Sequence, residues 1–177
     1  MSIKAEKNFS LKDQLFNEAT VTELASALGK AHRKFDQQLY IDQVLAKFPE
    51  LELKARIEHM VDVLGNHLPD DLSKAIKVLE KALPPPLDPT KTDDDFGTFI
   101  WSVPGEYVAR HGCNEAHIDE SLAFLQKATK RFTSENPIRP FLKQFNKRTM
   151  KFVHECARDE NYHVRRLASE GIRPFLP

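Results

Sequence analysis

Two glutamates near the carboxyl end of the chain stand beside arginines, in two phrases that nearly repeat. The first phrase, SENPIRPFL, covers residues 134–142, and the second, SEGIRPFL, covers residues 169–176. Each sets one carboxylate, Glu135 or Glu170, close to an arginine at the edge of an expected helix. A basic surface that carries isolated acids can bind an anionic polymer and act on it chemically.

Arginines are dense within and between these phrases. Residues 134–177 hold nine Lys or Arg and five Asp or Glu, whereas the whole chain has 26 basic and 26 acidic residues. The chain as a whole therefore has no field that attracts nucleic acid, but this stretch is net positive. The candidate phosphate-binding side chains are Arg139, Arg165, Arg166, Arg173 and His163.

A simpler interpretation of the same residues stays open. Arg166 and Glu170 are four residues apart, and Glu170 and Arg173 are three apart, so both pairs can form salt bridges on a solvated helix face. Glu135, next to a helix start, favours the positive end of the helix dipole. In the functional interpretation the arginines bind phosphates, and both carboxylates face one groove.

Other site chemistries have little support in the sequence. His154, Cys156 and His163 lack the spacing of zinc motifs, and two cysteines, Cys113 and Cys156, are too few for a disulfide framework. No phosphate loop, dinucleotide-binding motif or nucleophile elbow is present. We therefore expect no metal and no cofactor.

The elements that position these residues are expected to be helices, because helical periodicity dominates the sequence. Apolar residues recur at intervals of three and four in residues 21–31, where Thr20 and Glu23 have the spacing of a capping box. A helix capped by Asn136 is expected to open with Pro137. Other helices are expected at residues 39–48, 53–68, 70–83, 96–111, 114–131, 147–158 and 161–172. No stretch has a convincing strand period, so the expected fold is all-α.

Consecutive antiparallel helix pairs joined by short turns indicate a bundle or an α-solenoid. Asp159, then Val164 and Ala168, resemble the second helix of a HEAT-like repeat, with the aspartate as its cap. The near-repeat recurs after 35 residues, but it aligns the start of one helix with the end of another. We expect a solenoid of helix pairs and do not take the near-repeat as its period.

Size and composition predict one domain over residues 1–177, in which the proline-rich residues 84–95 form a long loop. The amino terminus lacks the apolar core of a signal peptide, and no apolar run is long enough for a membrane helix. We therefore expect a cytoplasmic protein without a membrane partner.

The segments FTSENPIRPFL and ENYHVRRLASEGIRPFLP resemble the bacterial DNA alkylation-repair glycosylases of the AlkC type. The resemblance is most specific in HVRRLASEG-x-RP-x-LP and extends weakly over the amino-terminal helices. It implies a HEAT-like solenoid, related to the AlkD type, that excises cationic N-alkylated bases such as 3-methyladenine from double-stranded DNA.

The same resemblance implies roles for individual residues. Glu135 and Glu170 would line the active-site cleft as catalytic carboxylates, and the arginines would line the DNA path. Family members continue beyond the position of Pro177 with a tryptophan, further repeats and commonly an Ig-like domain. We therefore expect the chain to be either a fragment or a naturally short version of such a protein, and its enzymatic activity stays open. The alternative is a non-catalytic HEAT-like module that binds DNA or another protein.

Overall fold

The computed structural model describes residues 10–90 and 97–174. Within these residues the secondary structure is helical and contains no strand. The helices are α1 (Leu11–Leu15), α2 (Glu18–Ala31), α3 (Gln37–Leu45), α4 (Leu53–Gly65), α5 (Leu72–Ala82), α6 (Ser102–Gly112), α7 (Ile118–Ala128), α8 (Glu135–Gln144), α9 (Asn146–Cys156) and α10 (Tyr162–Gly171). Short 3-10 turns at Phe48–Glu50 and Phe99–Trp101 precede α4 and α6.

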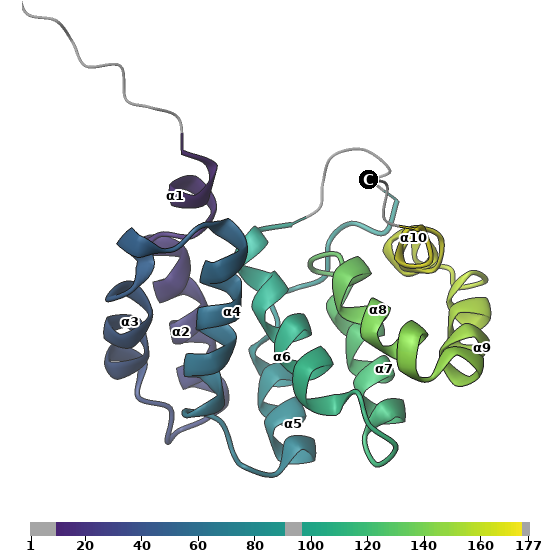
Figure 1. Cartoon of the computed structure of the whole chain (residues 1–177), viewed down its shortest axis with the longest axis horizontal. Coiled ribbons are helices and arrows are strands. Elements are labelled where there is room, and N and C mark those ends of the chain that lie inside the picture. Colours follow the sequence, from purple (N-terminus) through teal and green to yellow (C-terminus); the bar gives the residue numbers. More distant parts are fainter. Residues whose placement is uncertain (1–9, 91–96, 175–177) are drawn as a thin grey trace, which may run out of the picture.

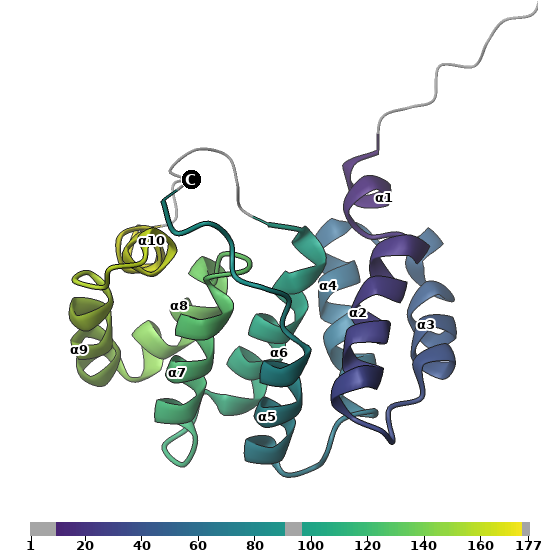
Figure 2. The same cartoon turned by 180° about the vertical axis from the view of Figure 1, so that it is seen from behind.

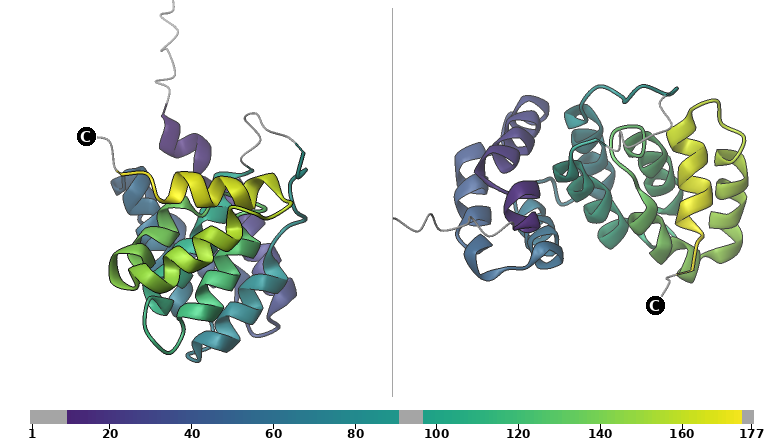
Figure 3. Two further views of the ribbon diagram at one scale, coloured as in Figure 1. Left: turned by 90° about the vertical axis from the view of Figure 1, so that its right-hand side faces the viewer. Right: turned by 90° about the horizontal axis from the view of Figure 1, so that it is seen from above.

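The helices stack in two rows, as expected for a solenoid of helix pairs (Figures 1 and 2). One row runs α3, α4, α6, α8 and α10, and the other runs α2, α5 and α7, with α9 beside α7. Viewed from above, the helix pairs follow one another along the long axis of the molecule (Figure 3). This arrangement confirms the all-α solenoid predicted from the sequence.

One apolar core runs between the rows. Each helix contributes the residues that recur every three or four positions, for example Leu24 and Leu28 of α2, Leu79 of α5 and Leu125 of α7, all with no exposed surface. Burial of these faces supplies most of the driving force for folding, because it removes apolar surface from water. None of the described helices is both long and apolar enough to span a membrane.

Several helix boundaries differ from the sequence-based expectation. α2 begins after Asn17, whose side chain accepts from the backbone of Ala19 and Thr20 in a capping box, so the expected box of Thr20 and Glu23 is wrong. The short helix α1, which the sequence analysis did not predict, precedes it. The expected helix at residues 96–111 begins instead at Ser102, which puts Pro104 in its first turn, where proline is tolerated.

The carboxyl-terminal helices also begin at other residues. α8 starts at Glu135 rather than Pro137, so Asn136 lies inside the helix and does not cap it. α10 is capped by Asn161, whose side chain accepts from the backbone of His163 and Val164. The expected cap, Asp159, instead accepts from the backbone N–H of Asn161 at 2.8 Å. In both segments several neighbouring residues are good caps, so residue type alone does not fix where the helix begins.

Candidate nucleic-acid interface

Helices α8 and α10 lie side by side in the same row, and their contact forms the candidate site (Figure 1). Side chains join the two helices at successive turns, since Glu135 on α8 meets Arg166 on α10 and Arg139 meets the backbone of Glu170. The approach is close at Gly171, where a Cβ atom would lie 2.8 Å from Cγ2 of Ile138. The two glutamates, 35 positions apart in sequence, are therefore brought to one helix contact.

Glu135 is held from two sides at the start of α8. Its Oε1 atom lies 2.5 Å from Nη1 of Arg166 and accepts from the Thr133 hydroxyl at 2.9 Å. Both side chains of the ion pair are 23% exposed. The first turn of a helix also favours a carboxylate through the helix dipole. Glu135 thus fixes the position of the Arg166 guanidinium, and it has only a small solvent-facing surface.

Glu170 pairs with an arginine that is more exposed to solvent than the partner of Glu135. Its Oε2 atom lies 3.1 Å from Nη1 of Arg173, whose side chain is 70% exposed, whereas Glu170 itself is 23% exposed. An ion pair with a solvated arginine is weak and exchanges readily for other charged groups. This carboxylate is therefore the better placed of the two to meet a cationic group arriving from solvent.

The local salt-bridge expectation is right for one pair and wrong for the other. Glu170 and Arg173 form the expected pair three residues apart. Arg166 does not form the expected pair with Glu170, because its guanidinium reaches across to Glu135 on the neighbouring helix. Thr133 was not singled out from the sequence, although its position two residues before Glu135 allows the bond that it makes.

Two of the predicted DNA-binding arginines donate to backbone carbonyl groups. Arg139 donates through Nη1 to the carbonyl of Arg173 at 2.9 Å and through Nη2 to that of Glu170 at 3.4 Å. Arg165, which is exposed, donates through Nη1 to the carbonyls of Asp159 and Glu160. Arg165 can add a phosphate contact at its exposed face, since a guanidinium has five N–H donors.

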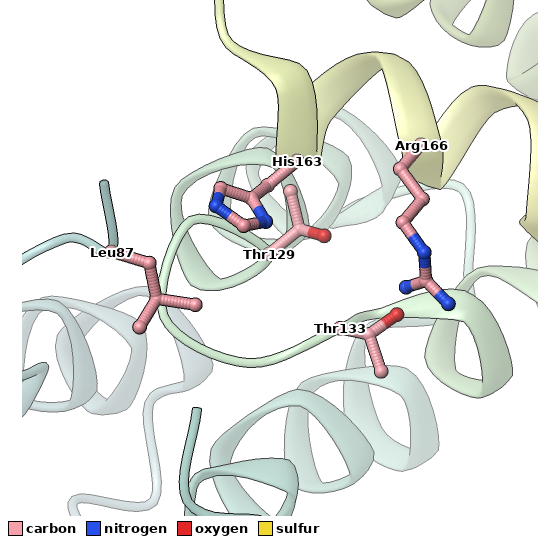
Figure 4. A pocket seen from close by; sticks show the side chains of 5 residues that line it. All are labelled: Leu87, Thr129, Thr133, His163 and Arg166. Atoms are coloured by element: carbon pink, nitrogen blue, oxygen red, sulfur yellow. The ribbon is translucent and has the colours of Figure 1, made fainter. Parts of the chain in front are cut away.

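His163 lies in the interior of the site. It is 6% exposed, and its Nε2 atom lies 3.1 Å from the carbonyl oxygen of Asp88 in the proline-rich connection. Figure 4 shows it beside a small cavity lined also by Leu87, Thr129, Thr133 and Arg166. The cavity, of about 10 Å³, has room for about one water-sized sphere. These contacts give His163 a positioning role for the connection and leave it little surface for a phosphate.

One backbone and one side-chain hydrogen bond join the connection after α5 to the residues that follow α7. Leu87 donates its N–H to the carbonyl of Lys130 at 2.8 Å, and Arg131 Nε donates to the carbonyl of Pro84 at 2.9 Å. Gly97 has a φ of 77° and its missing Cβ would lie 1.9 Å from the carbonyl oxygen of Arg131, so only glycine fits there. The end of the expected loop, residues 91–96, lies outside the described residues.

The chain is similar to two known proteins, one in sequence and one in structure. No protein-family profile matches it. It is 30% identical over 165 residues to the uncharacterized protein YhaZ of Bacillus subtilis, covering 93% of this chain and 43% of that protein. Its structure superposes with a TM-score of 0.78 and 27% identity on Pseudomonas fluorescens alkylpurine DNA glycosylase AlkC bound to DNA containing an abasic site analog.

That structural match covers 96% of this chain and 44% of the AlkC chain. The chain therefore spans less than half the length of both relatives. The agreement in fold and sequence over nearly all of its residues confirms the resemblance seen in its carboxyl-terminal motifs. Over nearly all of its residues the chain is therefore similar to this AlkC in sequence and shares its helical-repeat fold.

Proposed function

We propose that the chain acts in a DNA-repair glycosylase that releases cationic N-alkylated bases, such as 3-methyladenine, from double-stranded DNA. The observation that carries the proposal is the similarity, over 96% of the chain, to an alkylpurine DNA glycosylase solved with DNA. The two ion pairs beside the α8–α10 contact, Glu135 with Arg166 and Glu170 with Arg173, support the same function.

This reaction depends more on a negatively charged carboxylate than on a side chain that donates a proton to the leaving base. An alkylated purine already carries positive charge, so it leaves without strong protonation by the protein. As the N-glycosidic bond breaks, the sugar gains oxocarbenium character, as in glycoside hydrolysis. A carboxylate near C1′ stabilises that charge and can orient or deprotonate the attacking water. Selectivity then comes partly from how readily the base leaves, and a tight pocket for a flipped base becomes less necessary.

We propose different roles for the two glutamates. Glu170 pairs with a largely exposed arginine, so its carboxylate can turn to the sugar when a phosphate attracts Arg173. Glu135 is bound by both Arg166 and Thr133, which favours a supporting role as a second acidic wall and as the group that positions Arg166. Glu170 is therefore the main catalytic carboxylate in the proposal.

The exposed arginines, Arg165 and Arg173, are the proposed phosphate contacts. Each contact of this kind releases counterions, so the logarithm of the binding constant falls with the logarithm of salt concentration. Replacing either arginine with glutamine is expected to reduce that slope by about 0.9. A duplex affinity that does not respond to salt would favour the alternative, a module that binds a protein partner.

The direct test of the activity is release of 3-methyladenine from methylated duplex DNA, with unmethylated DNA as control. The experiment uses this chain and a longer protein that contains it. Release is expected from methylated DNA only, and Glu170→Gln is expected to slow it on the order of 100-fold, as for loss of one transition-state electrostatic contact. No release by either protein would refute the proposed function.

A further inference from the structure

The arginine on α8 that faces α10, Arg139, is partly buried, whereas Arg165, which also donates to two carbonyl groups, is exposed and so keeps surface for a phosphate. The guanidinium of Arg139 donates to the carbonyls of Arg173 and Glu170, and its Nε atom is shielded from solvent. Cationic side chains bind carbonyl groups at the carboxyl end of a helix with help from the helix dipole, here in addition to the backbone N–H of Arg173, which donates to the Glu170 carbonyl at 3.2 Å. Arg139 is thus a cap that α8 supplies to the end of α10.

The two carbonyls that Arg139 binds belong to the two members of one ion pair. Glu170 and Arg173 are joined through their side chains at 3.1 Å, and both backbones are held by the same guanidinium. The rest of this contact is also tight, since Gly171 packs against Ile138, the residue before Arg139. The backbone that carries the Glu170 carboxylate is therefore fixed to α8 through one side chain.

We propose that Arg139 is a positioning residue that acts through Glu170: it holds the last turn of α10 so that this carboxylate faces the sugar of the damaged nucleotide. The proposal rests on the proposed glycosylase function for its catalytic part, but the capping contact stands on the structure alone. It changes the role expected from the sequence, in which Arg139 lines the DNA path as a phosphate contact.

Three measurements on Arg139→Met distinguish the two roles. If Arg139 positions Glu170, hydrogen exchange of residues 168–173 becomes at least several-fold faster, because the last turn of α10 loses its cap. The single-turnover rate of base release falls by on the order of 10- to 100-fold, as expected for a misplaced catalytic group. The salt slope of duplex binding stays at the wild-type value, since no phosphate contact is lost.

Arg173→Met and Arg110→Met are the comparison variants. Arg173→Met removes a proposed phosphate contact and is expected to lower the salt slope by about 0.9. Arg110, which joins α6 to α4 through Asp62, lies outside the site. Arg110→Met therefore tests whether loss of any arginine between helices slows base release, and it is expected to leave the rate unchanged.

Arg139→Lys keeps the charge but replaces the two-pronged guanidinium with a single ammonium group. It is expected to keep the salt slope and to lose most of the rate that Arg139→Met loses. A wild-type rate in this variant, or a slope reduced by about 0.9 with an unchanged rate in Arg139→Met, would overturn the proposal in favour of phosphate contact. If the wild-type protein releases no base, the proposed function fails, and unchanged exchange in Arg139→Met would separately overturn the cap.

Discussion

Arginines join helices at both ends of the molecule, but they do so with different partners. At the amino-terminal end Arg56 of α4 is 3% exposed and lies 4.7 Å from the ring centre of Phe48. It donates to one carboxylate and four carbonyl groups, those of Asp13, Lys12, Phe16, Phe48 and Leu51. At the carboxyl-terminal end Arg166 and Arg173 are paired with carboxylates that keep part of their surface in water.

The difference separates a structural arginine from one that is available to a ligand. A guanidinium whose donors are used by buried carbonyl groups cannot leave them without exposing unsatisfied polar atoms. A guanidinium paired with a partly solvated carboxylate can exchange that partner for a phosphate at small cost. Arg56 therefore belongs to the scaffold, Arg173 to the proposed DNA surface, and Arg139 resembles Arg56 in its use of carbonyl partners.

The largest expected effect on stability is that of Arg56→Met. The substitution leaves the buried carbonyl of Phe16 without its donor and removes one of the two donors to the Phe48 carbonyl, so the free energy of unfolding should fall by about 2–5 kcal/mol. Urea denaturation measures it. Arg148→Met is the matched control, because Arg148 pairs with Asp119 on the surface, and its effect on the free energy of unfolding should be much smaller. Equal losses of unfolding free energy in the two variants would contradict the structural role of Arg56.

A smaller loss is expected when the contact between α8 and α10 is opened. In Gly171→Ala the added methyl group would lie 2.8 Å from Ile138, so overpacking should lower the free energy of unfolding by about 1–3 kcal/mol. Gly65→Ala is the control, since its methyl group would meet only Tyr107 at 4.0 Å. There the better helix propensity of alanine should be neutral or stabilising. Thermal unfolding of the two variants decides whether α8 and α10 are as close as described.

The smallest effect is expected at Glu106, a carboxyl between α6 and α4. Burial raises its pKa above the usual value, opposed by Arg110 and Lys54 and aided by Glu58. An acid whose pKa is raised by folding destabilises the native state once the pH rises above its unfolded pKa. Glu106→Gln should therefore be more stable than the wild type at pH 7 by less than about 1 kcal/mol, and no more stable at pH 3. Urea denaturation at both pH values checks the sign, and a loss of stability at pH 7 would contradict it.

The sequence predicted what depends on local periodicity. Val164 and Ala168, which match the second helix of a HEAT-like repeat in the sequence, are buried on α10 in the structure. The pair of Glu170 with Arg173 follows from their spacing along the helix. The roles of Glu135 and Glu170 as catalytic carboxylates came from the family resemblance and stay predictions.

Long-range contacts could not be predicted from the sequence. Spacing pairs Arg166 with Glu170, but the contact of α8 with α10 brings Glu135 closer, and no local pattern reports that contact. In the same way, His163 lies on an arginine-rich helix but is buried against the carbonyl of Asp88, 75 positions away. Its burial depends on where the proline-rich connection runs, which composition alone does not specify.

The most direct test of the account compares the two glutamates in one assay. Single-turnover release of 3-methyladenine from methylated duplex DNA is measured for the wild type, Glu170→Gln and Glu135→Gln at saturating protein. The account predicts a loss on the order of 100-fold for Glu170→Gln and a smaller one for Glu135→Gln, whose carboxylate is already bound by Arg166 and Thr133. A Glu170→Gln variant as fast as the wild type would contradict it.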